Sequence, residues 1–252
     1  MEVYAYERLT AQEIQNIAEN EHAIAVLDIG SIEQHGYHLP VGTDYIIGQA
    51  FLDEAVKRLD SENVTYLLLP QLPFSCSIEH QNVPGTITFT PIMVIQMIEA
   101  VGESLLRAGL KNLVIMSGHG GNEHEMEIAA RELHIKGMNT FCIHNFLAQG
   151  KYGAEESDVH AGALETSVML EIAPDTVHMD KITKEASDSV EIWDSMTDHF
   201  SCASQAWIAT DLSKEGVCGK PILGKAKQGK YWLNTMGSEI AKAFKTIEKQ
   251  LF

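Results

Sequence analysis

Cysteines and basic residues are scarce in this sequence, and each shortage excludes a class of protein. The four cysteines lie far apart and form no C-x-x-C pair, which argues against a zinc ribbon, a redox motif and a disulfide framework. Acidic residues outnumber basic residues by 35 to 18, for a formal net charge of −17. Such a charge repels nucleic acid and anionic membranes, so we expect neither as a partner.

Long apolar runs are also missing. No run approaches the roughly 20 residues that a membrane-spanning helix needs. The first residues, MEVYAYERLT, lack the basic start and apolar core of a signal peptide. We therefore expect a soluble, cytoplasmic protein. Hydrophobic residues make up 45% of the chain, enough for the core of one α/β domain over residues 1–252.

Short apolar segments alternate with amphipathic segments over the first 145 residues. The pattern predicts strands at 23–29, 64–69, 113–116 and 140–145, and helices at 10–20, 44–59, 92–108 and 123–136. This alternation is typical of a mostly parallel sheet with helices on both faces. After residue 186 the pattern dissolves, and we expect loops and a candidate subunit contact before a closing helix at about 234–250.

Histidines and carboxylates concentrate in loops that follow the predicted strands, and in such sheets ligands bind beyond the carboxyl ends of the strands. Glu33 and His35 follow the first strand, and their spacing directs both side chains to the same side of an extended backbone. Asp44 begins the next helix, whose positive dipole end favours an ionised carboxylate.

Two further loops add similar residues. His119 stands between glycines after the third strand, in a loop with neither the G-x-G-x-x-G pattern nor the lysine of a phosphate-binding loop. The later segment 158–167 carries Asp158, His160 and Glu165 near the start of a helix.

The joint occurrence of these residues predicts a metal site. Histidines and carboxylates on separate loops form a mixed nitrogen and oxygen site for Zn²⁺, Mn²⁺ or Fe²⁺. Five ligands exceed the needs of one tetrahedral ion, whereas two ions ~3.5–4 Å apart, bridged by a carboxylate and a water, use them naturally. Burying so many acids without a cation would be costly. We expect two divalent ions, with Zn²⁺ as the first expectation.

The segments that carry these residues resemble the creatininase (creatinine amidohydrolase) family. The resemblance runs in order from Gly30 to Gly219 and includes the following stretches: Gly30-Ser-Ile-Glu-Gln-His-Gly-Tyr-His-Leu-Pro-Val-Gly-Thr-Asp44, Glu79-His80, Pro84-Gly85-Thr86, Ser117-Gly-His-Gly-Gly-Asn122, Asp158-Val-His-Ala-Gly-Ala-Leu-Glu-Thr-Ser167 and, more weakly, Gly216-Val-Cys-Gly219. It implies a three-layer α/β sandwich, a binuclear metal centre, hydrolysis of a C–N bond in a small-molecule substrate, and a homo-oligomer, usually a hexamer.

The resemblance also implies roles for single residues. Carried over by position, Glu33 and His119 hold one ion, His35 holds the other, and Asp44 bridges both. His160 lies beside the reacting carbon as the acid/base residue.

Three further residues are expected to contact the substrate, and one to support the catalytic histidine. Asp158 is expected to orient the ring of His160. His80 and the backbone N–H groups of Gly120 and Gly121 are expected to bind the substrate.

One departure from the family pattern affects the second ion. Members that hydrolyse creatinine carry a glutamate two residues after the loop histidine, where this chain has Gly121. We expect Glu165 to supply the missing oxygen, with Glu123 or Asp158 as alternatives. Those members also place tryptophan near the substrate ring, and no tryptophan stands just before His160. Creatinine is therefore not the expected substrate.

The expected reaction is hydrolysis of a C–N amide bond, in a cyclic amide or a formamide, by a metal-bridging hydroxide. The family also includes formamide deformylases, a peptidase of a redox-cofactor pathway and lactone hydrolases. A hydrolase of lactones or other small metabolites on the same binuclear centre is therefore the first alternative. A non-catalytic metabolite binder is the second.

Overall fold

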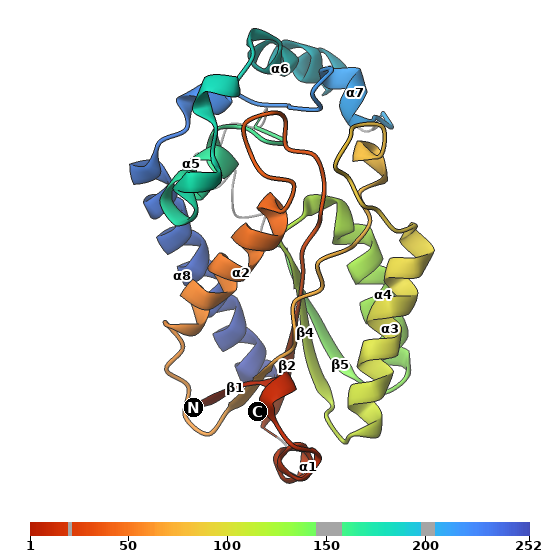
Figure 1. Cartoon of the computed structure of the whole chain (residues 1–252). Helices are drawn as coiled ribbons and strands as arrows, with labels where there is room; N and C mark the ends of the chain where they lie inside the picture. The colour runs from red at the N-terminus through yellow and green to blue at the C-terminus, as the bar shows by residue number, and fades with distance from the viewer. Residues whose placement is uncertain (20–21, 145–157, 198–204) are drawn as a thin grey trace.

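A five-stranded parallel sheet forms the centre of the computed structural model, which describes residues 1–19, 22–144, 158–197 and 205–252 (Figure 1). The strand order is β1-β3-β2-β4-β5. In chain order the strands are β1 (Glu2–Ala5), β2 (Ala23–Ile29), β3 (Thr65–Leu68), β4 (Asn112–Ser117) and β5 (Asn139–Ile143). Four of them confirm predicted strands to within two residues. The edge strand β1 was missed because four residues are too few to show a period.

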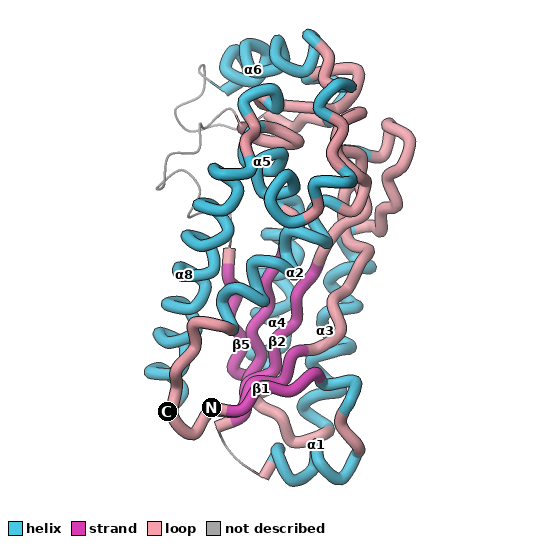
Figure 2. The backbone as a smooth tube through the Cα atoms, turned by 60° about the vertical axis from the view of Figure 1, so that its left-hand side comes forward, coloured by secondary structure: helices cyan, strands magenta, loops and turns pink. Residues whose placement is uncertain are grey.

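Helices cover both faces of the sheet, which confirms the three-layer α/β sandwich (Figures 1 and 2). One face is covered by α2 (Thr43–Val56), α5 (Ala163–Ile172) and α8 (Ala226–Leu251), and the other by α1 (Ala11–Ala18), α3 (Pro91–Arg107) and α4 (Glu123–Ile135). Every residue of β2 is buried. Ile24 and Val26 pack in the core beneath α2, α5 and α8, and Ala25 and Leu27 pack in the core beneath α1, α3 and α4. The side chains alternate in this way because successive side chains of a strand point to opposite faces.

The last third of the chain is more helical than its sequence pattern predicts. Two helices, α6 (Lys184–Thr197) and α7 (Ala209–Leu212), lie beyond the carboxyl ends of the strands (Figure 1). The prediction of loops after residue 186 was therefore wrong for α6, whose polar composition hides its helical period. The closing helix α8 also starts earlier than expected, at Ala226.

The strand order creates one point in the sheet where a ligand can bind. The chain leaves β2 through α2 to reach β3, and then returns through α3 to β4 on the other side of β2. Connections after β2 and after β4 thus run to opposite faces, which leaves a crevice at the carboxyl ends of these neighbouring strands. The loops that carry Glu33, His35 and His119 begin at this crevice.

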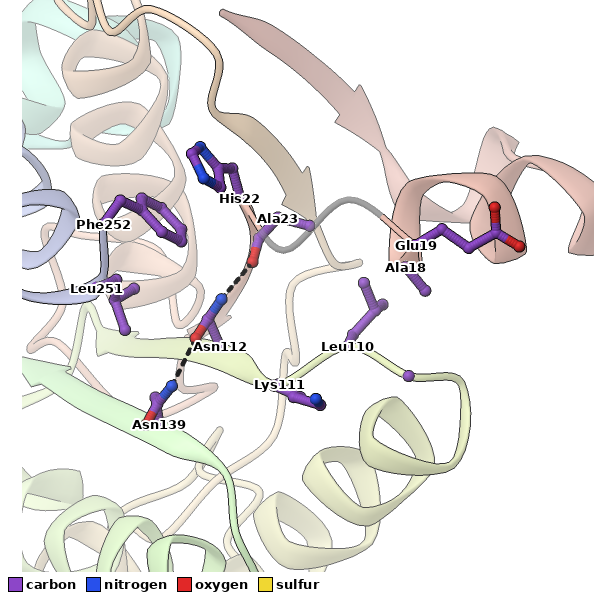
Figure 3. Close-up of a pocket in the computed structure, with 11 residues that line it drawn as sticks. Ala18, Glu19, His22, Ala23, Leu110, Lys111, Asn112, Asn139, Leu251 and Phe252 are labelled. Atoms are coloured by element: carbon purple, nitrogen blue, oxygen red, sulfur yellow. Dashed lines mark hydrogen bonds between the residues drawn. The ribbon is translucent and has the colours of Figure 1, made fainter.

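A cavity of about 660 Å³ lies at the opposite, amino end of the sheet (Figure 3). There Asn112 Nδ2 donates to the Ala23 carbonyl at 2.9 Å, and Asn139 Nδ2 donates to Asn112 Oδ1 at 2.9 Å. Both amide side chains thus have hydrogen-bond partners. The histidine and carboxylate cluster lies at the other end of the sheet. Within the described ranges, no helix combines the length and apolarity needed to cross a membrane.

Candidate metal centre

Four predicted ligands from separate segments meet at the crevice between β2 and β4. Glu33 and His35 follow β2, Asp44 lies in the first turn of α2, and His119 follows β4, and all four are at least 94% buried. His35 Nε2 lies 3.2 Å from Asp44 Oδ1, and His119 Nδ1 lies 3.4 Å from Asp44 Oδ2. His119 Nδ1 is also 3.2 Å from Glu33 Oε2. Asp44 therefore offers one oxygen to each histidine, as a bridging carboxylate does.

Unsatisfied polar atoms at this point fit divalent cations. Glu33 Oε1, His35 Nε2 and Asp44 Oδ2 are buried and have no hydrogen-bond partner among the described residues. His35 Nδ1–H donates to the Glu33 carbonyl at 3.1 Å, so Nε2 is the ring nitrogen that faces Asp44 and that a metal ion would use. Buried acceptors without donors are costly, and cations held between these atoms would remove that cost.

The electrostatics of the cluster also favour positive charge. Burial raises the pKa of Glu33 to about 8. Burial opposes a charged His35, but Asp44, Glu165 and Glu33 raise its pKa to about 10. Burial likewise opposes ionisation of Asp44, yet His35 and His119 hold its pKa well below the usual range. A buried group of acids this dense thus retains protons on its histidines, and metal ions would take their place.

Glu165 completes the side of the cluster that His35 faces. Its Oε2 lies 3.7 Å from His35 Nε2 and accepts a hydrogen bond from the Ala161 N–H at 2.6 Å. Ligand atoms of His35, His160 and Glu165 all lie within 4.8 Å of one another. The first turn of α5 therefore brings the carboxylate to the place where the sequence predicts a missing oxygen ligand.

The two alternatives to Glu165 have other contacts. Glu123 Oε1 lies 3.8 Å from His144 Nδ1, on a cluster separate from His35. The Asp158 oxygens accept the N–H groups of Ala163 and Leu164 at 2.7 and 2.8 Å, at the N-terminus of α5. Capping of this kind stabilises a helix start. The expected orienting role of Asp158 toward His160 stays a prediction.

His160 is held in one orientation beside the cluster. Its Nε2–H donates to the Gln34 carbonyl at 2.7 Å, and its Nδ1 lies 3.5 Å from Glu33 Oε1. Its backbone pairs with Cys218 in both directions, at 2.9 and 2.8 Å. Burial, with His80 and His35 nearby, keeps the pKa of His160 well below its usual range. The ring is therefore neutral, with Nδ1 directed at the cluster.

Gln34 links these residues and is not among the site residues that the sequence predicts. Its Nε2 donates to the Gly216 carbonyl at 3.0 Å and lies 2.9 Å from His80 Nδ1. Gly216 has a φ of +72°, and a Cβ there would lie 2.1 Å from Gln34 Nε2. The Gly-Val-Cys-Gly segment thus needs glycine to approach Gln34. The only sequence signal for Gln34 was its place between two predicted ligands.

A cavity of about 270 Å³ opens onto the cluster. Its lining includes the three predicted substrate contacts, His80, Gly120 and Gly121. Trp207 also lines it, with its ring edge-on to that of Trp193 at a centroid distance of 5.4 Å. The sequence carried no signal for Trp207, because it lies far along the chain from every ligand motif. The substrate role of the lining residues stays a prediction.

Comparison with known families agrees with this geometry. A family model described as Creatininase, creatinine amidohydrolase, matches residues 7–244. The chain belongs to the creatininase family. It is therefore a hydrolase of that family and shares its amidohydrolase character.

Two relatives with different names are similar to this chain. The mycofactocin precursor peptide peptidase of Mycobacterium ulcerans (strain Agy99) is 31% identical over 210 residues, which cover 81% of this chain and 78% of the relative. The creatinine amidohydrolase of Pseudomonas putida is 26% identical over 183 residues, which cover 63% of this chain and 68% of the relative.

Solved creatininase structures share the fold. A creatininase with Mn aligns with a TM-score of 0.76 at 19% identity, over 96% of this chain and 98% of the other. A creatininase mutant of the Zn-Zn type aligns with a TM-score of 0.75 at 20% identity, over 95% of this chain and 96% of the other. A creatininase mutant complexed with creatine aligns with a TM-score of 0.75 at 19% identity, over 96% and 98%. Creatininase neighbours thus carry zinc or manganese.

Proposed function

We propose that this chain hydrolyses a C–N amide bond of a small molecule with two divalent ions. The observation that carries the proposal is the position of Asp44, whose two oxygens each face a buried histidine, within 3.4 Å. Glu33 and His119 would hold one ion, and His35 and Glu165 would hold the other. Zn²⁺ is the first candidate and Mn²⁺ the second, since creatininase structures contain both. Fe²⁺ also suits these ligands.

The ions and His160 divide the chemistry between them. Bound ions would supply a water that loses a proton near neutral pH and positive charge opposite the developing oxyanion. His160 Nε2–H is committed to the Gln34 carbonyl at 2.7 Å, so Nδ1 is the atom that exchanges protons. Because burial keeps this ring neutral, the Nδ1 lone pair is free. Nδ1 would take the proton that the attacking water loses and deliver it to the leaving nitrogen.

The substrate class follows from the cavity and the relatives. A space of about 270 Å³ suits a small cyclic amide or formamide. It also suits the end of a peptide, and the relatives at 31% identity are named peptidases. The peptide bond is therefore the second candidate, and a lactone the third. We place His80 and the backbone N–H groups of Gly120 and Gly121 against the substrate.

Elemental analysis and a substrate panel test this function. Purified protein is expected to hold two ions per chain. A panel of cyclic amides, formamides, short peptides and lactones is expected to show hydrolysis of one amide class, lost with chelator and restored with metal. Turnover of lactones alone would overturn the amide assignment. Metal-free protein that hydrolyses the same substrate equally fast would overturn the metal mechanism.

We also propose a homo-oligomer, with the hexamer of the family resemblance as its expected form. Support comes from exposed apolar side chains on the loops beside the centre, where Val41 and Ile87 are 41% and 49% exposed. The two loops share a strip of backbone, since Glu33 N–H donates to the Val41 carbonyl and Ile87 N–H donates to that of Ile32. Size-exclusion chromatography with light scattering measures the molar mass and tests this proposal. A monomer at micromolar concentration would reject it.

A further inference from the structure

Glu79 contacts the far side of a candidate ligand. It lies in the short 3-10 helix η2 (Ile78–His80), in the long connection after β3. Its Oε1 lies 3.3 Å from His119 Nε2, a buried nitrogen that has no hydrogen bond of good geometry among the described residues. The other ring nitrogen, Nδ1, faces Glu33 and Asp44. The imidazole of His119 therefore stands between the metal cluster on one side and a separate carboxylate on the other.

Gly121 borders the same contact. A Cβ at this position would lie 2.3 Å from His119 Nε2 and 2.5 Å from Glu79 Oε1. Both distances are shorter than Cβ contacts in proteins, so a side chain would have to separate the imidazole from the carboxylate. The contact between Glu79 and His119 therefore depends on the absence of a side chain at position 121.

The position of Glu79 distinguishes it from a ligand. Its Oε1 meets Nε2 of His119, whereas Glu33 Oε2 and Asp44 Oδ2 both meet Nδ1, the ring nitrogen on the opposite side. Glu79 also keeps 19% of its side chain exposed, whereas Glu33 is fully buried. A carboxylate placed behind a histidine, and outside the cluster, acts on the ring rather than on the ion.

We propose that Glu79 is a positioning residue that holds the His119 imidazole through Nε2 and directs Nδ1 to the ion. The inference rests on the proposed function, because it needs a metal at Nδ1. A carboxylate behind a metal-binding histidine sets the tautomer and ring orientation and makes the ligand more basic. Gly121 leaves the space in which that carboxylate meets the ring.

Metal affinity tests the inference directly. Zn²⁺ binding is measured by competition with a chromophoric chelator for wild type, Glu79→Gln and Glu79→Ala. We expect Glu79→Ala to bind one of its two ions about 10–100-fold more weakly while still holding two at saturating zinc. Glu79→Gln keeps an oxygen acceptor and is expected to lose less. Glu103→Ala is the matched control, because Glu103 Oε1 faces Lys136 Nζ at 2.7 Å and belongs to none of the histidine and carboxylate clusters among the described residues.

A double-mutant cycle tests the link with Gly121. Gly121→Ala is expected to weaken zinc binding on its own, since the new methyl group would displace His119 and Glu79. In Glu79→Ala the methyl group has more room. The double variant should therefore lose less zinc-binding free energy than the sum of the losses in the two single variants. Circular dichroism and thermal unfolding of each variant confirm that the comparison is between folded proteins. Strictly additive losses would overturn the arrangement.

Other outcomes separate this inference from the proposed function. Wild-type affinity for both ions in Glu79→Ala would reject the positioning role and leave the metal hydrolase standing. Loss of one whole ion at saturating zinc in Glu79→Gln would make Glu79 a direct ligand and overturn the inference. A wild-type chain that binds no divalent ion would reject the proposed function itself, and the inference with it.

Discussion

Asp44 Oδ1 lies 3.2 Å from His35 Nε2, although the two side chains reach this point from different elements. His35 comes from the loop after β2, and Asp44 comes from the first turn of α2. The hydrogen bond from His35 Nδ1 to the Glu33 carbonyl, 3.1 Å long, turns Nε2 toward the carboxylate. This pair sets the centre of the candidate metal site, since the second oxygen of Asp44 faces His119.

Replacing Asp44 by asparagine should release metal. The proposed bridge would lose its charge and one of its two metal-facing oxygens. We expect metal content to fall from two ions to one or none. Because ions bound only to the folded chain stabilise it, by about 2.7 kcal/mol at a free concentration 100 times Kd, the melting temperature should fall as well. Plasma mass spectrometry and thermal unfolding with and without chelator measure both effects. Full metal content in Asp44→Asn would contradict the bridging role.

Replacing His160 by alanine should slow turnover and leave the metal bound. A positioned acid/base residue typically contributes about 10²–10⁴-fold to the rate. The loss should fall mainly on kcat, because His160 Nδ1 exchanges protons during the reaction rather than before it. Steady-state kinetics and metal analysis of the same preparation provide the check. An unchanged kcat would remove His160 from the mechanism.

Replacing Asp158 by alanine should affect stability more than rate. Its carboxylate accepts the N–H groups of Ala163 and Leu164 at the start of α5. Loss of such a cap costs about 0.5–2 kcal/mol. Denaturant unfolding should show this loss, with kcat within a few-fold of wild type. A rate loss as large as that of His160→Ala would instead support the orienting role expected from the sequence.

Replacing Glu165 by glutamine should affect one ion only. Glu165 faces His35 at 3.7 Å, and His35 faces Asp44 Oδ1, whereas His119 faces Asp44 Oδ2. We therefore expect the ion beside His35 to be lost or weakened, and the ion beside Glu33 and His119 to remain. Zinc titration should show one tight site instead of two. Simultaneous loss of both ions, or retention of both with wild-type affinity, would contradict this assignment.

Replacing Asp28 by asparagine should change how stability depends on pH. Burial raises the pKa of Asp28 to about 7, whereas an unfolded aspartate titrates near about 3.9. Between these values the unfolded chain loses a proton that the folded chain keeps, so rising pH favours unfolding up to about 7 and has no further effect above it. We therefore compare the unfolding free energy of Asp28→Asn with that of wild type. The difference should shift in favour of the variant by about 3 kcal/mol between pH 5 and pH 8.

Urea unfolding of both metal-loaded proteins at the two pH values measures this difference. Metal binding depends on pH in both proteins, so that dependence cancels in the comparison. An equal difference at pH 5 and pH 8 would show that Asp28 titrates normally in the folded chain.

Local pattern predicted most of the fold in this chain. Strand β2 matches its predicted bounds because a run of seven buried residues, six of them apolar, between polar turns has few other interpretations. Helix α6 was missed because its buried face is narrow, including Ala186, Ser189 and Val190 within a polar segment. Edge strand β1 was missed because its pairing with β3 lies outside its own four residues.

The sequence by itself determined the α/β alternation and the loops where histidines and carboxylates gather, because periodicity and motif spacing are local properties of the chain. Tertiary structure decided which of those side chains meet. It selects Glu165 over Glu123 and Asp158 beside His35, and it places Glu79 behind His119. Those contacts depend on distances between segments that are far apart in the chain, and such distances are set by how helices and loops pack against the sheet.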